Sequence, residues 1–379
     1  MVRIRKPGIL ALIVSLFIAF LPHNADASEP MSAKSAILME QKTGRVLYEK
    51  DAHKISRIAS ITKIMTAILA IESGKMDRYV KVSESAAGTE GSSIYLKPGE
   101  KIKLRDLVYG LMLRSGNDAA AAIAEYVGGS LDGFAFLMNQ KAREIGMENT
   151  HFSNPHGLDD HENHYSTAYD MALLTRYAMQ NPEYQKISSA KSHRAPNPGE
   201  QWDRVWKNKN RLLSKYEYCT GGKTGYTKRA KRTLVTTAKK GDMQLIAVTL
   251  NAPDDWNDHI SMFETGFGNY DMAEVLSKGT IEPEGNPYKK ERLFLKKSVV
   301  YPAKENEMNL FEVKYKIEKI KLGKSKQPKV AGKAIVFFDG KEVKQVPIYL
   351  GKKPKEKKTS FLSSLKEMLF SFTGVNANG

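Results

Sequence analysis

Ser60-Ile61-Thr62-Lys63 is the stretch of sequence on which the interpretation of the whole chain depends. A serine and a lysine three positions apart on a helix project from the same side, one turn apart. The lysine amine can then take the proton from the serine hydroxyl, which makes the serine a nucleophile. At the start of a helix the serine N–H is unpaired and the helix dipole favours negative charge. The helix is predicted from the apolar residues Ile61, Ile64, Met65, Ile68 and Leu69 and from the stop at Gly74.

Two further tripeptides follow in order. Ser115-Gly116-Asn117 lies between predicted helices at 104–113 and 119–127, and Lys223-Thr224-Gly225 precedes β-prone runs at 233–238 and 245–250. Helical spacing also predicts helices at 134–145, 167–179 and 258–276. S-x-x-K with S-D-N and K-T-G is the motif set of class A β-lactamases and penicillin-binding proteins. A second K-T-G, at Lys42-Thr43-Gly44, lies between the strand-like runs 35–40 and 45–49 and is interpreted as a hairpin turn.

Around these motifs the chain resembles the low-molecular-mass penicillin-binding proteins, which are serine D-alanyl-D-alanine carboxypeptidases. The resemblance runs from about Ser32 to about Phe267, and within the family it is greatest to the sporulation-type enzymes of Gram-positive spore formers. It implies an α/β (α+β) fold of the β-lactamase/transpeptidase type, an antiparallel sheet with helices packed on it. The segments that carry it are Arg57-Ile58-Ala59, Leu111-Met112-Leu113-Arg114, Asn154-Pro155-His156-Gly157-Leu158, Trp206-Lys207-Asn208-Lys209-Asn210 and Gly221-Gly222.

The resemblance also implies a mechanism. Ser60 attacks the carbonyl between the two terminal D-alanines of a peptidoglycan stem peptide, Lys63 is the general base, and Ser115 relays the proton to the leaving amine. β-Lactams mimic the dipeptide and acylate Ser60, and no cofactor or metal is required. The residues expected to bind substrate are Asn117, Lys223, Thr224, Gly225 and Tyr226, with the backbone N–H groups of Ser60 and Tyr226 as the oxyanion hole.

One departure from the family concerns the substrate's terminal carboxylate. Related enzymes often have an arginine after the K-T-G strand, but residues 251–259 of this chain contain none. His259, Arg229 and Arg232 are the possible replacements. The single cysteine, Cys219, excludes an internal disulfide and is interpreted as a small packed residue.

Three other functions are weighed against the carboxypeptidase. A class A β-lactamase needs a deacylating glutamate, and Asp159, Asp160 and Glu162 lie in a suitable loop, but residues 154–158 resemble the carboxypeptidases there. A zinc peptidase would use His151, His156, His161 and His164, but the H-E-x-x-H spacing is absent, so these are interpreted as hydrogen-bonded loop histidines. An inactive wall-binding protein would have lost a motif residue, and all are present.

Composition predicts four segments. Residues 1–27 are typical of a signal peptide ending in Ala25-Asp26-Ala27, 28–279 form the catalytic domain, 280–351 a small β-rich domain, and 352–379 a basic linker followed by an amphipathic helix. The net charge of +17 is concentrated after residue 280. For an exported chain without a nucleic-acid-binding motif, it indicates anionic polymer or lipid. The apolar residues Phe361, Leu362, Leu365, Met368, Leu369 and Phe372 trace one helical stripe, which predicts peripheral attachment to the cell membrane.

Overall fold

The computed structural model describes residues 31–288, 291–320 and 327–352. The described chain divides into two compact units, one with the residues up to Lys240 and Gln244–Gly266, the other with Gly241–Met243 and the residues from Phe267 onward. The predicted signal peptide and the predicted C-terminal helix lie outside the described residues. Within the described ranges, no helix combines the length and apolar character needed to cross a bilayer.

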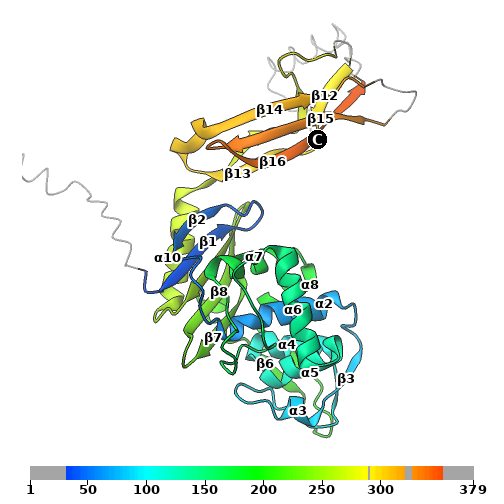
Figure 1. The fold of residues 1–379 in the computed structure, drawn as a ribbon, viewed down its shortest axis with the longest axis vertical. Helices are drawn as coiled ribbons and strands as arrows, with labels where there is room; N and C mark the ends of the chain where they lie inside the picture. Colours follow the sequence, from blue (N-terminus) through cyan, green and yellow to red (C-terminus); the bar gives the residue numbers. More distant parts are fainter. Residues whose placement is uncertain (1–30, 289–290, 321–326, 353–379) are drawn as a thin grey trace, which may run out of the picture. The chain divides into compact units, whose positions relative to one another are not determined.

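A five-stranded sheet organises the first unit, in the order β2-β1-β9-β8-β7 (Figure 1). Its strands are β1 (Ser35–Glu40), β2 (Val46–Lys50), β7 (Cys219–Thr227), β8 (Lys231–Lys240) and β9 (Met243–Leu250). The predicted N-terminal hairpin is confirmed, because β1 pairs antiparallel with β2 around the Lys42-Thr43-Gly44 turn. β1 also pairs antiparallel with β9, so segments from opposite ends of this unit meet in the centre of the sheet.

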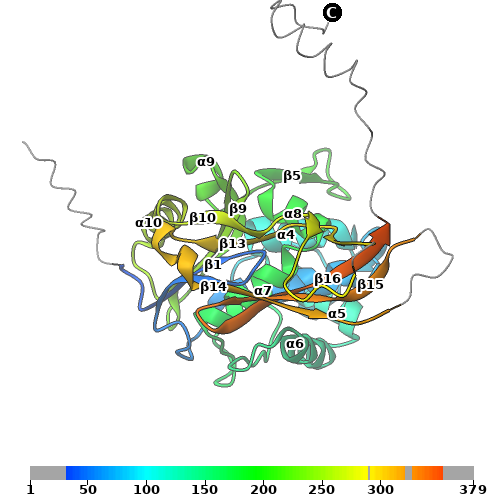
Figure 2. The ribbon, with the colours of Figure 1, turned by 90° about the horizontal axis from the view of Figure 1, so that it is seen from above.

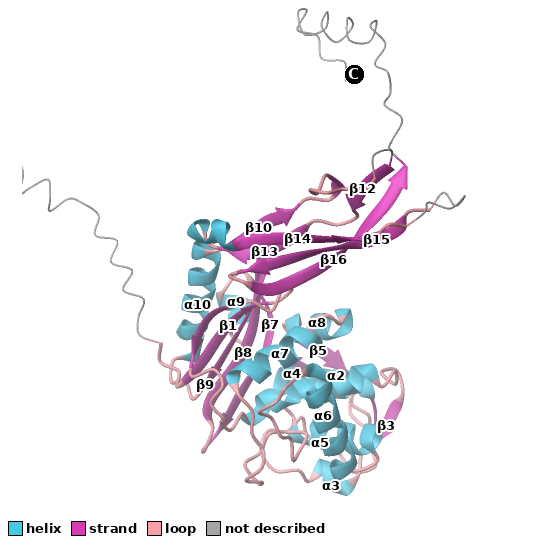
Figure 3. Ribbon diagram, turned by 45° about the horizontal axis from the view of Figure 1, so that its top comes forward, coloured by secondary structure: helices cyan, strands magenta, loops and turns pink. Residues whose placement is uncertain are grey.

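Helices cover both faces of this sheet. α10 (Asp255–Asn269) lies on one side, and the main group of helices lies on the other (Figures 1 and 3). The predicted helices are confirmed, because apolar residues at helical spacing face one continuous core. The main group consists of α2 (Lys63–Glu72), α4 (Leu104–Arg114), α5 (Asn117–Gly128), α6 (Leu131–Ile145), α7 (Ala168–Ala178) and α8 (Pro182–Ser189).

Several shorter elements of this unit were not predicted. Asn181 caps α8 by accepting hydrogen bonds from the N–H groups of Glu183 and Tyr184, with Pro182 at the first helical position. The other short elements are α3 (Glu84–Ala87), α9 (Leu212–Lys215), the paired strands β3 (Tyr79–Lys81) and β4 (Lys101–Lys103), and the hairpin of β5 (Ser192–Ala195) and β6 (Arg204–Lys207).

The second unit is a β structure in its described residues. A five-stranded sheet has the order β11-β12-β16-β15-β14, and its three long strands β14, β15 and β16 run side by side in Figures 1 and 2. Leu293, Leu295, Ala334, Ile348 and Leu350 form its core. The strands are β11 (Gly279–Ile281), β12 (Glu291–Leu295), β14 (Phe311–Ile317), β15 (Lys329–Phe338) and β16 (Lys341–Lys352), with β10 (Asp271–Leu276) and β13 (Val299–Ala303) as a separate pair and a 3-10 helix, η2 (Glu305–Leu310).

One prediction in this region was wrong. Residues 258–276 were expected to be helical throughout, but α10 ends at Asn269 and 271–276 form β10. β10 pairs antiparallel with β13, from Asp271 opposite Ala303. Because that partner is distant in sequence, local periodicity could not reveal the ladder that overrides helical spacing here.

Candidate active site

Ser60 lies in a 3-10 turn, η1 (Ala59–Thr62), that leads into α2. The sequence predicted that Ser60 itself begins the helix; instead α2 begins at Lys63. Ala59 has a φ of +50°, in the left-handed region that a residue with a Cβ seldom adopts. Two buried hydroxyls fix this backbone: Thr62 Oγ1 donates to the Ala59 carbonyl at 2.8 Å, and Thr233 Oγ1 donates to the Ile58 carbonyl at 3.0 Å.

Gly157 packs directly against the same turn. A Cβ at position 157 would lie 1.9 Å from the Ala59 carbonyl oxygen, and the residue has a φ of +86°. Both the space and the backbone conformation therefore require glycine. The contact brings the loop of residues 154–158 against the turn that carries the nucleophile. This gives a structural role to a segment that the sequence analysis had used only as evidence of family resemblance.

The Lys63 amine is fully buried and has three hydrogen-bond partners. Its Nζ donates to Asn117 Oδ1 at 2.7 Å and to the His156 carbonyl at 2.6 Å, and it lies 3.2 Å from Ser60 Oγ, whose hydroxyl can donate to the lone pair of the neutral amine. Burial and, after it, the positive charge of Lys223 hold the pKa of Lys63 well below its ordinary value. The site therefore favours a neutral amine beside the serine hydroxyl, as a general base requires.

Lys223 is a second buried amine. It donates to Ser115 Oγ at 3.1 Å and to the Thr224 carbonyl at 2.6 Å. Burial and then the charge of Lys209 lower the pKa of Lys223 to about 7. Lys223 can therefore change protonation state near neutral pH, next to the hydroxyl of Ser115.

The second motif lies on the connection between α4 and α5, as predicted. Ser115 ends α4 with a φ of +66°, and Asn117 is the first residue of α5. The Asn117 backbone N–H donates to the Ser92 carbonyl at 2.6 Å, and its side-chain Nδ2 donates to the Glu90 carbonyl at 2.6 Å. These bonds fix the orientation of the amide that also accepts from Lys63.

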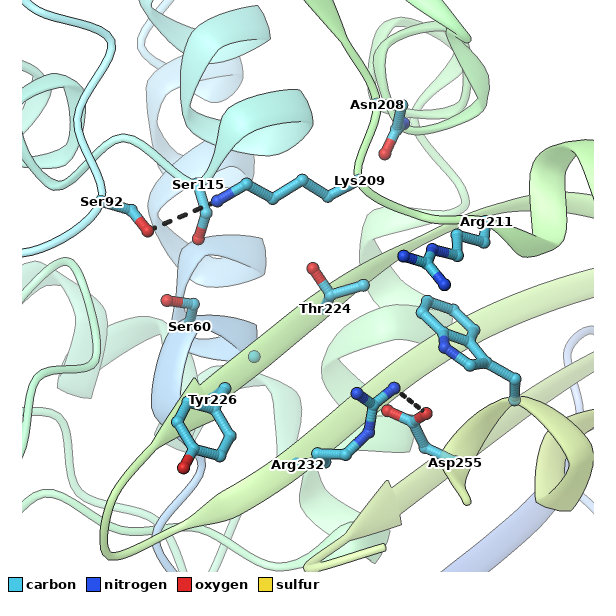
Figure 4. Close-up of a pocket in the computed structure, with 12 residues that line it drawn as sticks. Ser60, Ser92, Ser115, Asn208, Lys209, Arg211, Thr224, Tyr226, Arg232 and Asp255 are labelled. Carbon is cyan, nitrogen blue, oxygen red and sulfur yellow. Dashed lines mark hydrogen bonds and ion pairs between the residues drawn. The ribbon is translucent and has the colours of Figure 1, made fainter. Parts of the chain in front are cut away.

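The third motif lies within β7, along the edge of a cavity of about 580 Å³. Ser60, Ser115, Thr224, Gly225 and Tyr226 all line this cavity, and Figure 4 shows Ser60 between Ser115 and Tyr226. A Cβ at Gly225 would lie 2.9 Å from the Ser60 backbone nitrogen. Glycine therefore lets β7 approach the nucleophile closely, which positions two backbone segments around one small space.

Other cavity residues were not identified from the sequence. Lys209 extends across the cavity and donates to Ser92 Oγ at 3.4 Å (Figure 4). Its charge contributes to the lowered pKa of both Lys63 and Lys223. Lys209 belongs to the segment 206–210, for which the sequence analysis had found a resemblance to the family but no function. Its position across the cleft depends on tertiary contacts that no motif encodes.

The three candidate replacements for the missing arginine have different environments. Arg232, on β8, lines the cavity, forms an ion pair with Asp255, and lies 5.7 Å from the Trp256 ring. Arg229 pairs with Glu162 and does not line the cavity. His259 is fully buried between the hydroxyls of Thr236 and Thr249.

Arg211 also lines the cavity and was not foreseen. Figure 4 shows Arg211 and Arg232 both farther from Ser60 than Thr224 is. Arg232 and Arg211 therefore place positive charge at the end of the cavity beyond Thr224.

Three of the four loop histidines, His151, His156 and His164, form hydrogen bonds through their rings among the described residues. His164 Nε2 lies 2.9 Å from Thr62 Oγ1, and its Nδ1 accepts from the Ser153 N–H at 3.1 Å. His156 Nδ1 accepts from the Leu158 N–H at 3.2 Å. Cys219 is half-buried, and burial raises the pKa of its thiol to about 11. This raised pKa disfavours the thiolate that a nucleophilic or metal-binding role would need.

Comparison with known proteins agrees with this geometry. Residues 22–254 match the family described as D-alanyl-D-alanine carboxypeptidase (Peptidase S11), and residues 270–356 match the C-terminal domain of penicillin-binding protein 5. The carboxypeptidase DacF of Bacillus subtilis is 34% identical over 90% of each chain, and DacC of Escherichia coli is 35% identical over 68% of this chain and 67% of its own.

Solved structures show the same fold. Penicillin-binding protein 5 of Haemophilus influenzae is 26% identical and covers 86% of this chain and 98% of its own, with a TM-score of 0.69. A Streptomyces K15 DD-transpeptidase variant is 31% identical and covers 63% and 99%, with a TM-score of 0.60. The predicted fold class, a mixed helix and antiparallel-sheet unit followed by a small β domain, is confirmed. The chain therefore belongs to the peptidase S11 family of serine-type D-alanyl-D-alanine carboxypeptidases.

Proposed function

We propose that this enzyme removes the terminal D-alanine from peptidoglycan stem peptides through an acyl-enzyme on Ser60. The observation that carries the assignment of the nucleophile is the buried Lys63 amine, 3.2 Å from Ser60 Oγ and held at a lowered pKa. A serine beside a neutral amine, in a cavity that Gly225 and Tyr226 also line, is suited to acyl transfer.

In the proposed reaction, Lys63 takes the Ser60 proton as Oγ forms a bond to the carbonyl carbon of the penultimate D-alanine. The backbone N–H groups of Ser60 and Tyr226 stabilise the oxyanion. Ser115, hydrogen bonded to Lys223, then relays the proton from Lys63 to the amine nitrogen of the departing D-alanine as the peptide bond breaks, which leaves Lys63 neutral again. Water, activated by Lys63, then hydrolyses the ester and returns the proton to Ser60.

The terminal carboxylate has a binding site of its own in this proposal. Lys223 and Thr224 contact it from β7, and Arg232 is favoured over Arg229 and His259 because it alone of the three lines the cavity. Asp255 holds the Arg232 guanidinium in place through their ion pair, so the arginine is oriented before substrate binds.

Penicillin provides the direct test of the nucleophile. Wild-type protein incubated with a fluorescent penicillin should carry one covalent label, and a labelled peptide should map to Ser60. Ser60→Ala should remove the label without changing the melting temperature, and a control at Ser363, a second S-x-x-K serine, should keep it. A label on Ser115 instead would overturn the assignment.

Location and biological role extend the proposal. A signal peptide at residues 1–27 would export the enzyme, and the apolar stripe after Phe361 with the lysines at 352–358 would attach it to the anionic membrane surface. The similarity to DacF supports a role in wall maturation, with spore cortex as the specific candidate.

A chain truncated after Gly351 should hydrolyse substrate in solution and lose binding to anionic vesicles. Equal vesicle binding by both forms at low salt would refute the anchor.

A further inference from the structure

A second groove lies beside the catalytic cavity in the same unit. It has a volume of about 670 Å³. Its walls include Ser93 and Lys207, the immediate sequence neighbours of Ser92 and Asn208 in the catalytic cavity. The two spaces therefore adjoin along two chain segments, 92–93 and 207–208. Nothing in the proposed reaction uses the second groove.

Two aromatic side chains are displayed to solvent in this groove. Tyr95 is 82% exposed and Trp202 is 65% exposed. Tyr95 also has a φ of +62°, a left-handed conformation that is unfavourable for a residue with a bulky side chain. Strained backbone persists where the surrounding structure enforces it, and such positions cluster at ligand sites. Exposing a large aromatic face at this cost indicates a surface that is covered when a ligand binds.

A buried carboxylate makes the Tyr95 loop rigid. Asp118 is fully buried and accepts hydrogen bonds from Ser93 Oγ at 2.6 Å, from the Ile94 N–H at 3.0 Å and from the Leu96 N–H at 3.1 Å. The backbone that carries Tyr95 is thereby held in place before any ligand arrives, which lowers the entropic cost of binding. Because Asp118 directly follows Asn117, the same turn of α5 supports both spaces.

Polar groups complete the groove. Asn197 Oδ1 is buried and has no hydrogen-bond partner within the described ranges, which leaves an acceptor to be satisfied. Lys97 pairs with Glu200, and Arg204 pairs with Glu100. Arg114 and Lys207 have no ion-pair partner in the part of the chain that the structure describes, so the groove keeps unpaired positive charge.

We propose that this groove binds a sugar ring of the glycan strand to which the stem peptide is attached. The inference rests on the proposed function. Tyr95 and Trp202 offer flat faces for the apolar C–H side of a pyranose, and Asn197 Oδ1 offers an acceptor for a hydroxyl or acetamido N–H. Arg114 and Lys207 suit the carboxylates of the attached peptide.

One ligand can reach both sites because neighbouring residues of the chain line the two spaces. A stem peptide of four extended residues spans about 14 Å. Because the groove adjoins the cavity, a peptide acylating Ser60 can place its sugar in the groove without leaving the surface of one unit. The enzyme would then prefer stem peptides attached to glycan over free peptides, through contacts remote from the reacting bond.

The test compares one stem peptide with and without its disaccharide. Trp202→Ala and Tyr95→Ala should each lower kcat/KM about tenfold on the disaccharide peptide, while kcat/KM on the free peptide and the rate of penicillin acylation stay within about twofold. Trp202→Phe and Tyr95→Phe should restore most of the loss. Phe136→Ala removes another exposed aromatic, which lines neither space, and should change neither substrate.

Separate outcomes distinguish this inference from the proposed function. Equal losses on both substrates, or no loss on either, would overturn the glycan site while leaving the carboxypeptidase intact. Absence of penicillin labelling in the wild-type protein would overturn the proposed function itself.

A chitin oligosaccharide titrated into Ser60→Ala protein should quench tryptophan fluorescence, and Trp202→Phe should abolish the change. A response only to an anionic polymer such as teichoic acid would refute the sugar as ligand.

Discussion

Replacing Gly157 by alanine should loosen the nucleophile turn and slow acylation. The new Cβ would lie 1.9 Å from the Ala59 carbonyl oxygen, so one of the two segments must move by more than 1 Å to reach an ordinary contact. The left-handed φ of +86° costs a residue with a Cβ about 1–2 kcal/mol, and overpacking a filled site adds about 1–3 kcal/mol. The free energy of unfolding should therefore fall by about 2–5 kcal/mol.

Gly146→Ala is the matched control, because Gly146 has a φ of +88° with nothing within 4 Å of the added Cβ. It should show only the backbone cost, so the two variants should differ by about 1–3 kcal/mol in urea unfolding. Fluorescent-penicillin labelling rates should fall about 10- to 100-fold in Gly157→Ala, since a displacement of about 1 Å can have such an effect. Gly146→Ala should label at the wild-type rate. Equal stability and equal labelling rates in the two variants would refute the reasoning.

Four other results are expected. Lys63→Ala should slow penicillin labelling about as much as loss of the nucleophile, because the two groups act as one unit; a labelling rate within tenfold of wild type would contradict this. Arg232→Gln should raise KM for D-alanyl-D-alanine peptides with a free carboxylate more than KM for the amidated peptides, whereas Arg229→Gln should leave the ratio of the two KM values unchanged. The same change of this ratio in both variants would argue against the carboxylate site. With Lys223 cationic below its pKa of about 7, kcat/KM for carboxylate substrates should fall as pH rises through that value, and Lys223→Ala should remove this limb of the pH profile. Burial lowers the pKa of His259 to about 3, so the folded state holds the imidazole neutral while the unfolded chain protonates it near pH 6.5. The free energy of unfolding should therefore fall as the pH drops below 6.5, by about 2 kcal/mol at pH 5 from this residue. In urea unfolding, His259→Gln should lose less stability than the wild type between pH 7 and pH 5.

Local patterns predicted most of the elements around the site. The β1–β2 hairpin and the helices α4, α5 and α7 follow from periodicity and turn residues, because burial of one face imposes the repeat on the sequence. For elements that depend on a distant strand partner or leave no periodic pattern, the sequence analysis made a wrong prediction or none. β10 pairs with β13 instead of continuing a helix, and the β5–β6 hairpin is short and largely exposed, so it left no periodic signal.

The active site likewise contains contacts that sequence spacing predicts and contacts that only the fold creates. Ser60 and Lys63 could be paired from the sequence because one helical turn fixes their spacing. Lys223 and Ser115 are 108 positions apart, and no local rule brings their side chains to 3.1 Å. Lys209 and Arg211 line the cavity and the His156 carbonyl accepts from Lys63, although none of the three belongs to a catalytic motif, so only their tertiary contacts identify them.

The sequence by itself determined which chemical groups this protein has, the family they belong to, and which of them lie one helical turn apart. The tertiary structure alone decided the protonation behaviour of Lys63 and Lys223. Burial lowers the pKa of both amines, the charge of Lys223 lowers the pKa of Lys63 further, and the charge of Lys209 acts on both. The tertiary structure also placed Arg232, but neither Arg229 nor His259, along the cavity, and it placed Tyr95 and Trp202 in one groove. Desolvation and charge proximity are properties of the packed interior, and a linear pattern does not specify them.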